Sequence, residues 1–225
     1  MSNAIITGAS RGLGLAVARV LAEQGWRLVL DARGGADLER AARELGRVTE
    51  VVAVPGDVAD AAHRRALVSA AGTRIDLIIN NASTLGASPL PPLADYPLDA
   101  LERVYRVNVL GPLGLIQAAR PHLSANATIV NISSDAAVEG YPGWGGYGSS
   151  KAALDQLTAT LGGENPNLRV YAVDPGDMRT RMHQDAFPGE DISDRPEPHT
   201  VVPVLLDLLR GDQPSGRYRL QGVAA

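Results

Sequence analysis

Short apolar segments recur along this chain, and segments of helical periodicity separate them. The first helical pattern is carried by Leu13, Ala16, Val17, Val20 and Leu21. The apolar segments are continuous rather than alternating, and they cover residues 4–7, 28–30, 51–54, 77–79, 129–132 and 170–173, with 218–220 as a candidate last strand. Strands that are apolar on both faces belong to a parallel sheet covered by helices on both sides. The pattern therefore predicts an α/β fold with one doubly wound parallel sheet.

The length and composition limit the classes of site. A chain of 225 residues fits one domain over 1–225. It has no cysteine, and its four histidines are scattered without ligand spacing. We therefore expect no disulfide and no metal site.

The net charge and hydropathy limit the classes of partner. The formal net charge is −4, without the basic stripe of a nucleic-acid-binding protein. No segment reaches the ~18 consecutive apolar residues of a membrane span. The first strand pattern leaves no room for a signal peptide. We expect a cytoplasmic protein without nucleic-acid or membrane partners.

A glycine-rich turn joins the first strand to the first helix. It runs Thr7-Gly8-Ala9-Ser10-Arg11-Gly12-Leu13-Gly14. Glycines allow a tight turn and a close approach of backbone to pyrophosphate, and the helix N-terminus attracts the anion. A strand–helix turn without a ligand is the plainer alternative. In this context we expect a Rossmann-type site for a dinucleotide, held by Gly8, Ser10, Arg11, Gly12, Leu13 and Gly14.

Further motifs follow the turn in a fixed order. They are Asp57-Val58, Asn80-Asn81-Ala82, Asn108, Ser134, Tyr147 with Lys151, and Pro175-Gly176 with Thr180. With the TGxxxGxG spacing, the chain resembles compact members of the short-chain dehydrogenase/reductase family over almost its whole length. Ser83 stands where the family usually has glycine, and Asp174 where it commonly has asparagine.

Tyr147 and Lys151 are four residues apart, so on a helix they share one face. An ammonium group beside a phenol favours the phenolate and lowers the phenol's pKa. Tyr147 would then act as general acid or base on a carbonyl or alcohol. The resemblance implies that Ser134 orients the substrate oxygen, with Ser133 as the competing candidate.

Asn108 precedes a proline by four residues. In the family, the main-chain carbonyl of this asparagine holds a water in the proton relay. An intact helix would engage that carbonyl with the N–H of residue 112, but Pro112 has none. We expect the carbonyl to be free for water, with a kink that serves packing only as the alternative.

The choice between NADP and NAD depends on the end of the second strand. By the family's spacing from Gly25, the deciding residues are Ala32 and Arg33. An arginine accepts the ribose phosphate, whereas an acid repels it. Arg11 is a second basic candidate, but a register shift by one would place Asp31 at the ribose. We expect NADP(H) to be preferred, with NAD(H) possible.

The resemblance also implies the remaining contacts to the cofactor. Asp57 and Val58 would lie at the adenine, and Asn80 and Ala82 near the adenosine ribose. Tyr147, Lys151, Pro175, Gly176 and Thr180 would lie toward the nicotinamide.

The substrate side is less defined. Residues 181–199 are rich in Pro, Asp and Glu and are expected to form a lid. Asp135, Tyr141, Trp144 and Met182 are candidates to line the pocket for a small carbonyl or alcohol substrate.

Family members usually assemble through the helices that carry Asn108 and Tyr147, so a homodimer or homotetramer is expected. A non-catalytic NADP-binding sensor or scaffold remains an alternative, as does an epimerase or dehydratase for nucleotide sugars. Neither alternative accounts as well for the set Asn108, Ser134, Tyr147 and Lys151 in so short a chain.

Overall fold

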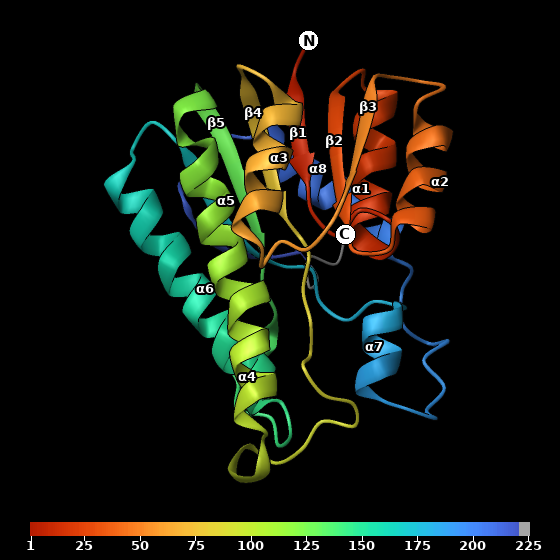
Figure 1. Cartoon of the computed structure of the whole chain (residues 1–225). Helices are drawn as coiled ribbons and strands as arrows, with labels where there is room; N and C mark the ends of the chain where they lie inside the picture. The colour runs from red at the N-terminus through yellow and green to blue at the C-terminus, as the bar shows by residue number, and fades with distance from the viewer. Residues whose placement is uncertain (221–225) are drawn as a thin grey trace.

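Seven parallel strands form one sheet in the order β3-β2-β1-β4-β5-β6-β7 (Figure 1). The computed structural model describes residues 1–220. The strands are β1 (Asn3–Ile6), β2 (Arg27–Ala32), β3 (Val51–Pro55), β4 (Ile75–Asn80), β5 (Leu123–Ile132), β6 (Arg169–Asp174) and β7 (Gly216–Arg219). Each predicted apolar segment lies within or overlaps one of these strands.

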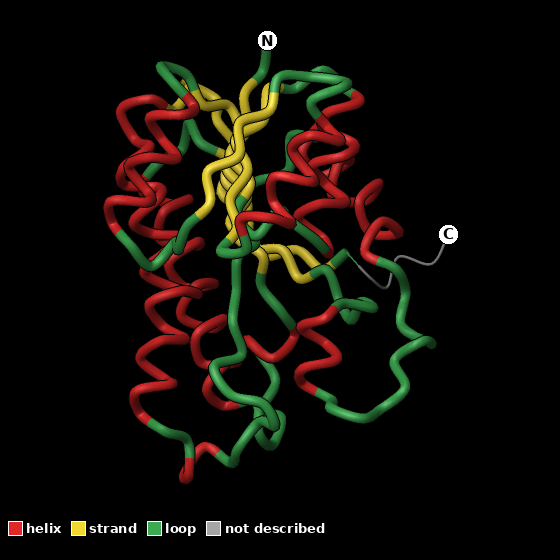
Figure 2. Tube along the Cα trace, turned by 45° about the vertical axis from the view of Figure 1, so that its right-hand side comes forward, coloured by secondary structure: helices red, strands yellow, loops and turns green. Residues whose placement is uncertain are grey.

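Helices cover both faces of the sheet, which confirms the predicted fold class. Figure 2 shows the sheet between two helical layers. One layer contains α1 (Gly12–Glu23), α2 (Gly35–Leu45) and α8 (Val202–Arg210), and the other contains α3 (Ala61–Ala71), α5 (Gly111–Ala119) and α6 (Gly145–Glu164). Within residues 1–220, no helix combines the length and the hydropathy that a bilayer span requires.

Local sequence signals set several helix ends. Gly25 follows α1 with a φ of 76°, a conformation that favours glycine. Asp60 caps α3, its carboxylate accepting a hydrogen bond of 2.8 Å from the N–H of Ala62. Thr180 caps α7 (Arg181–Ala186) in the same way, accepting from His183 at 3.2 Å. The segment 181–199 is therefore partly helical.

The strand order reverses on either side of β1, whose neighbours are β2 and β4. Ligands bind at such a reversal, beyond the carboxyl ends of the strands. Below that edge in Figure 1 lie α4 (Leu98–Tyr105), α7 and the long loop after β4. The site is therefore expected between these segments and the ends of the strands.

Candidate active site

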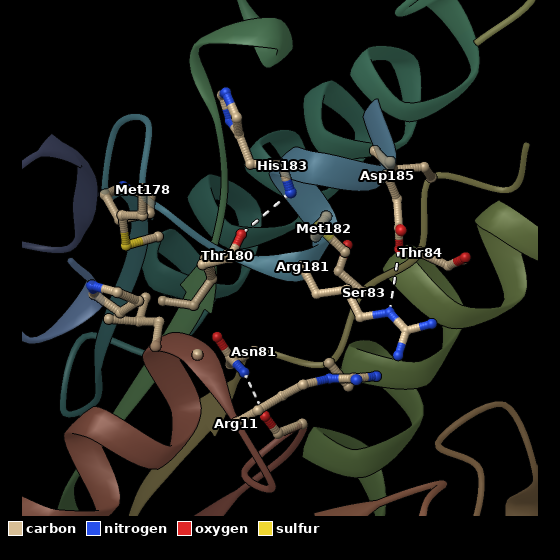
Figure 3. A pocket seen from close by; sticks show the side chains of 18 of the residues that line it. Arg11, Asn81, Ser83, Thr84, Met178, Thr180, Arg181, Met182, His183 and Asp185 are labelled. Carbon is tan, nitrogen blue, oxygen red and sulfur yellow. Dashed lines mark hydrogen bonds and ion pairs between the residues drawn. The ribbon is translucent and has the colours of Figure 1, made fainter. Parts of the chain in front are cut away.

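A cavity of about 770 Å³ opens at the carboxyl edge of the sheet (Figure 3). It is large enough for an extended ligand. Most of the predicted site residues line it: Gly8, Ser10, Arg11, Gly12, Leu13, Arg33, Asp57, Val58, Ala82, Ser134, Tyr147, Lys151, Pro175, Gly176 and Thr180. Gly14, Asn80 and Asn108 do not line it.

The glycine turn is closed around the end of β1. Gly8 has a φ of 66°, and a Cβ on it would come within 2.9 Å of Ala82. Gly14 lies behind the turn, where a Cβ would come within 2.5 Å of the Gly8 carbonyl oxygen. Both positions exclude a side chain, so the first turn of α1 packs directly on the loop.

Two neighbouring asparagines after β4 have different environments. The Asn80 side chain is buried and donates to Asn131 Oδ1 at 2.8 Å, away from the cavity. The Asn81 side chain lines the cavity and donates to the carbonyl oxygens of Thr7 and Gly8 at 3.0 and 3.1 Å. Asn81 therefore fixes the shape of the glycine turn, a role that sequence analysis did not assign to it.

Tyr147 and Lys151 lie one turn apart on α6. Lys151 Nζ is 5.4 Å from the centroid of the Tyr147 ring and donates to the Ile132 carbonyl oxygen at 2.6 Å. Both residues are buried. Burial disfavours the charged ammonium and lowers the pKa of Lys151 to about 8.

The expectation of a lowered phenol pKa is wrong for this structure. Burial raises the pKa of Tyr147 above its ordinary value, because the phenolate loses its hydration, and Asp174 and Asp135 add to the rise. The hydroxyls of Ser134 and Ser83 act in the opposite direction without offsetting burial. Tyr147 is therefore a protonated phenol at neutral pH.

The two candidate serines after β5 differ in their contacts. The Ser134 hydroxyl lies beside Tyr147, donates to Asp135 Oδ1 at 2.9 Å and accepts from the Ala136 N–H at 3.2 Å. The Ser133 hydroxyl is buried without a hydrogen-bond partner among residues 1–220.

Asn108 lies in a π-helical turn, Arg106–Leu110, between α4 and α5. The N–H of Gly111 reaches back five residues to the carbonyl oxygen of Arg106. The break in α-helical bonding lies where Pro112 removes a donor. The Asn108 side chain is fully engaged: Oδ1 accepts from the Ser83 hydroxyl and the Thr84 N–H, and Nδ2 donates to the Thr84 carbonyl oxygen and the Ser150 hydroxyl.

Ser83, the departure from the family's glycine, thus has a defined place. Its hydroxyl donates to Asn108 at 3.1 Å and also lies near Tyr147. No local sequence pattern could have indicated this, since the partners are 25 and 64 residues away.

The charged residues at the end of the cavity where the adenosine is expected fall into two groups. Arg11 and Arg33 line it, and the charge of Arg33 helps to lower the pKa of Asp57. The carboxylates are paired: Asp57 with Arg103, and Asp31 with His63, at 2.6 Å from Nε2 to Oδ1. Burial raises the pKa of Asp31, with the contact to His63 acting against it.

Arg217, on β7, links three parts of the site. Its guanidinium donates to the Ser134 carbonyl oxygen at 2.9 Å and pairs with Asp155 at 2.9 Å and Asp174 at 3.3 Å. Asp174 also accepts from the Gly176 N–H at 2.9 Å. The unusual acid before Pro175 is therefore neutralised by a residue near the end of the chain.

Three of the four candidate substrate contacts line the cavity: Asp135, Trp144 and Met182. The fourth, Tyr141, does not; its side chain is exposed and its hydroxyl donates to Glu139 at 2.9 Å. Figure 3 shows Met182 and Arg181 on α7 facing the segment that carries Ser83 and Thr84. Within the described part of the chain, no group of three or more metal-binding side chains gathers.

Comparison with known proteins gives a family match over most of the chain. Residues 2–191 match the family described as short chain dehydrogenase. A 3-oxoacyl-acyl-carrier-protein reductase of rhamnolipid biosynthesis from Pseudomonas aeruginosa is 34% identical over 194 residues, covering 80% of this chain and 73% of that protein.

Solved structures of short chain dehydrogenases have the same fold as this chain. A short chain dehydrogenase from Pseudomonas syringae superposes with a TM-score of 0.91 at 29% identity, covering 98% of this chain and 94% of that one. A short chain dehydrogenase from Shigella flexneri in complex with NADP superposes with a TM-score of 0.89 at 27% identity, covering 98% and 97%.

Proposed function

Since this chain belongs to the short-chain dehydrogenase/reductase family and is an oxidoreductase, we propose that it transfers a hydride between NADP(H) and a small carbonyl or alcohol substrate. The observation that carries the proposal is the convergence of Ser134, Tyr147 and Lys151 in the cavity that the glycine turn also lines. The nicotinamide supplies or accepts the hydride when it is bound. The residues of the chain bind the cofactor and the substrate, orient the substrate and transfer the proton.

Tyr147 is the proton donor in carbonyl reduction. Like an ordinary tyrosine, it is protonated at neutral pH and can donate its proton to a carbonyl oxygen as that oxygen gains charge. The Ser134 hydroxyl lies beside it and, once it rotates away from Asp135, donates its hydrogen bond to the same substrate oxygen. Lys151, whose pKa is about 8, is charged at neutral pH and stabilises the phenolate left after transfer.

The π-helical turn provides a route for proton supply. We propose that the Asn108 carbonyl oxygen holds a water between solvent and Lys151. The missing donor at Pro112 and the change in bonding between Arg106 and Gly111 support this role. The Asn108 side chain acts differently, anchoring Thr84 and Ser150.

The charge arrangement at the adenosine end supports NADP(H) as the preferred cofactor. Arg33 and Arg11 are available to a ribose phosphate, and a guanidinium can bind two phosphate oxygens at once. The nearby acids already have side-chain partners: His63 contacts Asp31, and Arg103 pairs with Asp57. NAD(H) remains a usable but weaker alternative.

The remaining parts of the proposal concern the surroundings of the site. Residues 181–199, with α7, act as the lid over the substrate. The chain works as a homodimer or homotetramer in the cytoplasm, and Leu110, which is 55% exposed beside Asn108, would be covered in that assembly. Sedimentation that gave only monomer would contradict the assembly.

The test is oxidation of NADPH against a panel of aldehydes, ketones and quinones. Tyr147→Phe is expected to lose turnover and retain NADPH binding. Tyr218→Phe is the matched control, because Tyr218 does not line the cavity and its hydroxyl donates to the Pro214 carbonyl oxygen. Equal turnover in wild type and Tyr147→Phe would refute the role of Tyr147.

A further inference from the structure

Asp31 and His63 form a buried pair beneath the adenosine end of the cavity. Asp31 is the next-to-last residue of β2, and His63 lies in the first turn of α3. Their exposed fractions are 1% and 9%, and His63 Nε2 lies 2.6 Å from Asp31 Oδ1. The other carboxylate oxygen accepts from the Gly8 N–H at 3.4 Å. The pair thus joins the glycine turn to the opposite helical layer.

We propose that His63 is a specificity-determining residue: it neutralises Asp31, so that the adenosine site accepts the phosphate of NADP. This inference rests on the proposed function, since it concerns the cofactor of the same site. It goes further by assigning the preference to a residue that does not itself line the cavity.

The position of Asp31 explains why it needs a partner. Asp31 lines the cavity together with Arg33 and Gly8. A carboxylate that lines a phosphate site repels the phosphate, and the repulsion grows as the effective dielectric constant falls. When the His63 ring is protonated, it donates to the carboxylate as an imidazolium, and the pair then has no net charge. The guanidinium of Arg33 then decides the preference.

The residues around His63 fix the position of its ring. Gly56, at the end of β3, leaves the space that the ring occupies: a Cβ there would come within 2.2 Å of His63 Nδ1. Asp60 caps the helix that carries His63. A methyl group on Gly56 would therefore displace the ring without removing either member of the pair.

Asp57, the second acid of this region, also contacts a side chain of a neighbouring helix. Asp57 lies next to Gly56 and pairs with Arg103 of α4. It raises the pKa of Asp31, so the two carboxylates repel each other. Each acid contacts a side chain of a different helix, which leaves the guanidinium groups of Arg11 and Arg33 for the cofactor.

The experiment measures dissociation constants for NADPH and NADH by titration of cofactor fluorescence, without substrate. His63→Gln retains a hydrogen-bond donor to Asp31 and removes the charge. The expected result is a loss of about tenfold in the NADPH to NADH preference, carried mostly by NADPH. Gly56→Ala is expected to shift the preference in the same direction. His122→Gln makes the same chemical change outside the cavity and is expected to have no effect.

A double variant identifies the carboxylate as the cause. In an Asp31→Asn background, His63→Gln is expected to leave the preference unchanged, because no charge remains to be neutralised. If His63→Gln folds and keeps the wild-type preference, or if its effect persists in Asp31→Asn, the inference is wrong while the NADP assignment stands. A wild type that binds NADH as tightly as NADPH would overturn both.

Discussion

The guanidinium of Arg217 donates a hydrogen bond of 2.9 Å to the main-chain carbonyl oxygen of Ser134. The same guanidinium pairs with Asp174, whose carboxylate holds the N–H of Gly176. One side chain from β7 thus connects the serine beside Tyr147 to the turn expected at the nicotinamide.

Arg217 is therefore expected to position Ser134. Arg217→Met should lower kcat by about tenfold with little change in cofactor affinity, because a small displacement of an orienting group is costly in rate. Restoration of kcat by adding Asp174→Asn would show that the uncompensated acid causes the loss. Arg219→Met is the control, since Arg219 is exposed and lies 3.7 Å from the same acid. Equal losses in the Arg217 and Arg219 variants would contradict this role.

Lys151 is expected to lower the free energy of unfolding, although catalysis requires it. Its pKa falls from 10.5 to about 8 on folding, which corresponds to about 3 kcal/mol. The folded protein binds fewer protons than the unfolded chain between these values, so stability rises with pH in that window. Lys151→Met should be about 2 kcal/mol more stable at pH 7, after loss of the bond to Ile132, and inactive.

Thermal unfolding of both proteins between pH 7 and pH 10 checks this. The difference in stability between Lys151→Met and wild type should become smaller as the pH rises above 8. An advantage that stays constant across this range would contradict the burial of a charged lysine.

Pro112→Ala should restore a donor four residues after Asn108 and favour regular helix there. We expect unchanged folding and lower kcat, because the Asn108 carbonyl oxygen would no longer be free for water. Circular dichroism and steady-state kinetics measure the two effects. Pro121→Ala, in the connection before β5, serves as control. Unchanged turnover in Pro112→Ala would remove the support for the water relay.

Arg33→Asp should reverse the cofactor preference. An acid at this position repels the ribose phosphate and binds the free ribose hydroxyls. We expect kcat/KM for NADPH to fall by about a hundredfold or more, with NADH then preferred. Arg43→Asp, on the exposed side of α2, makes the same charge change and should leave the ratio unchanged. If Arg33→Asp leaves the ratio of kcat/KM for NADPH to kcat/KM for NADH unchanged, Arg33 does not determine the cofactor preference.

Much of the fold could be predicted from the sequence because its signals are local. The strands are continuous apolar runs, and the glycine turn lies between a run and a helical pattern. The spacing of Tyr147 and Lys151 also predicts a shared helix face, and both side chains line the cavity. These features depend on neighbours in the chain rather than on distant contacts.

The parts that sequence analysis missed depend on contacts between distant segments. His63 lies 32 residues from Asp31, and Arg217 lies 83 from Ser134. The pKa of Tyr147 was predicted in the wrong direction because spacing shows the nearby lysine but not the burial of both groups. The side chain of Asn80, which is predicted to lie near the adenosine ribose, donates to Asn131 on the neighbouring strand.

The most direct test of the central claim is NADPH oxidation by wild type and Tyr147→Phe with the carbonyl panel, alongside NADPH binding. We expect turnover by wild type, a loss of about a hundredfold or more in Tyr147→Phe, and similar NADPH affinity in both. Turnover that persists in Tyr147→Phe would contradict the role of Tyr147, and a wild type that binds no nicotinamide cofactor would contradict the proposed function itself.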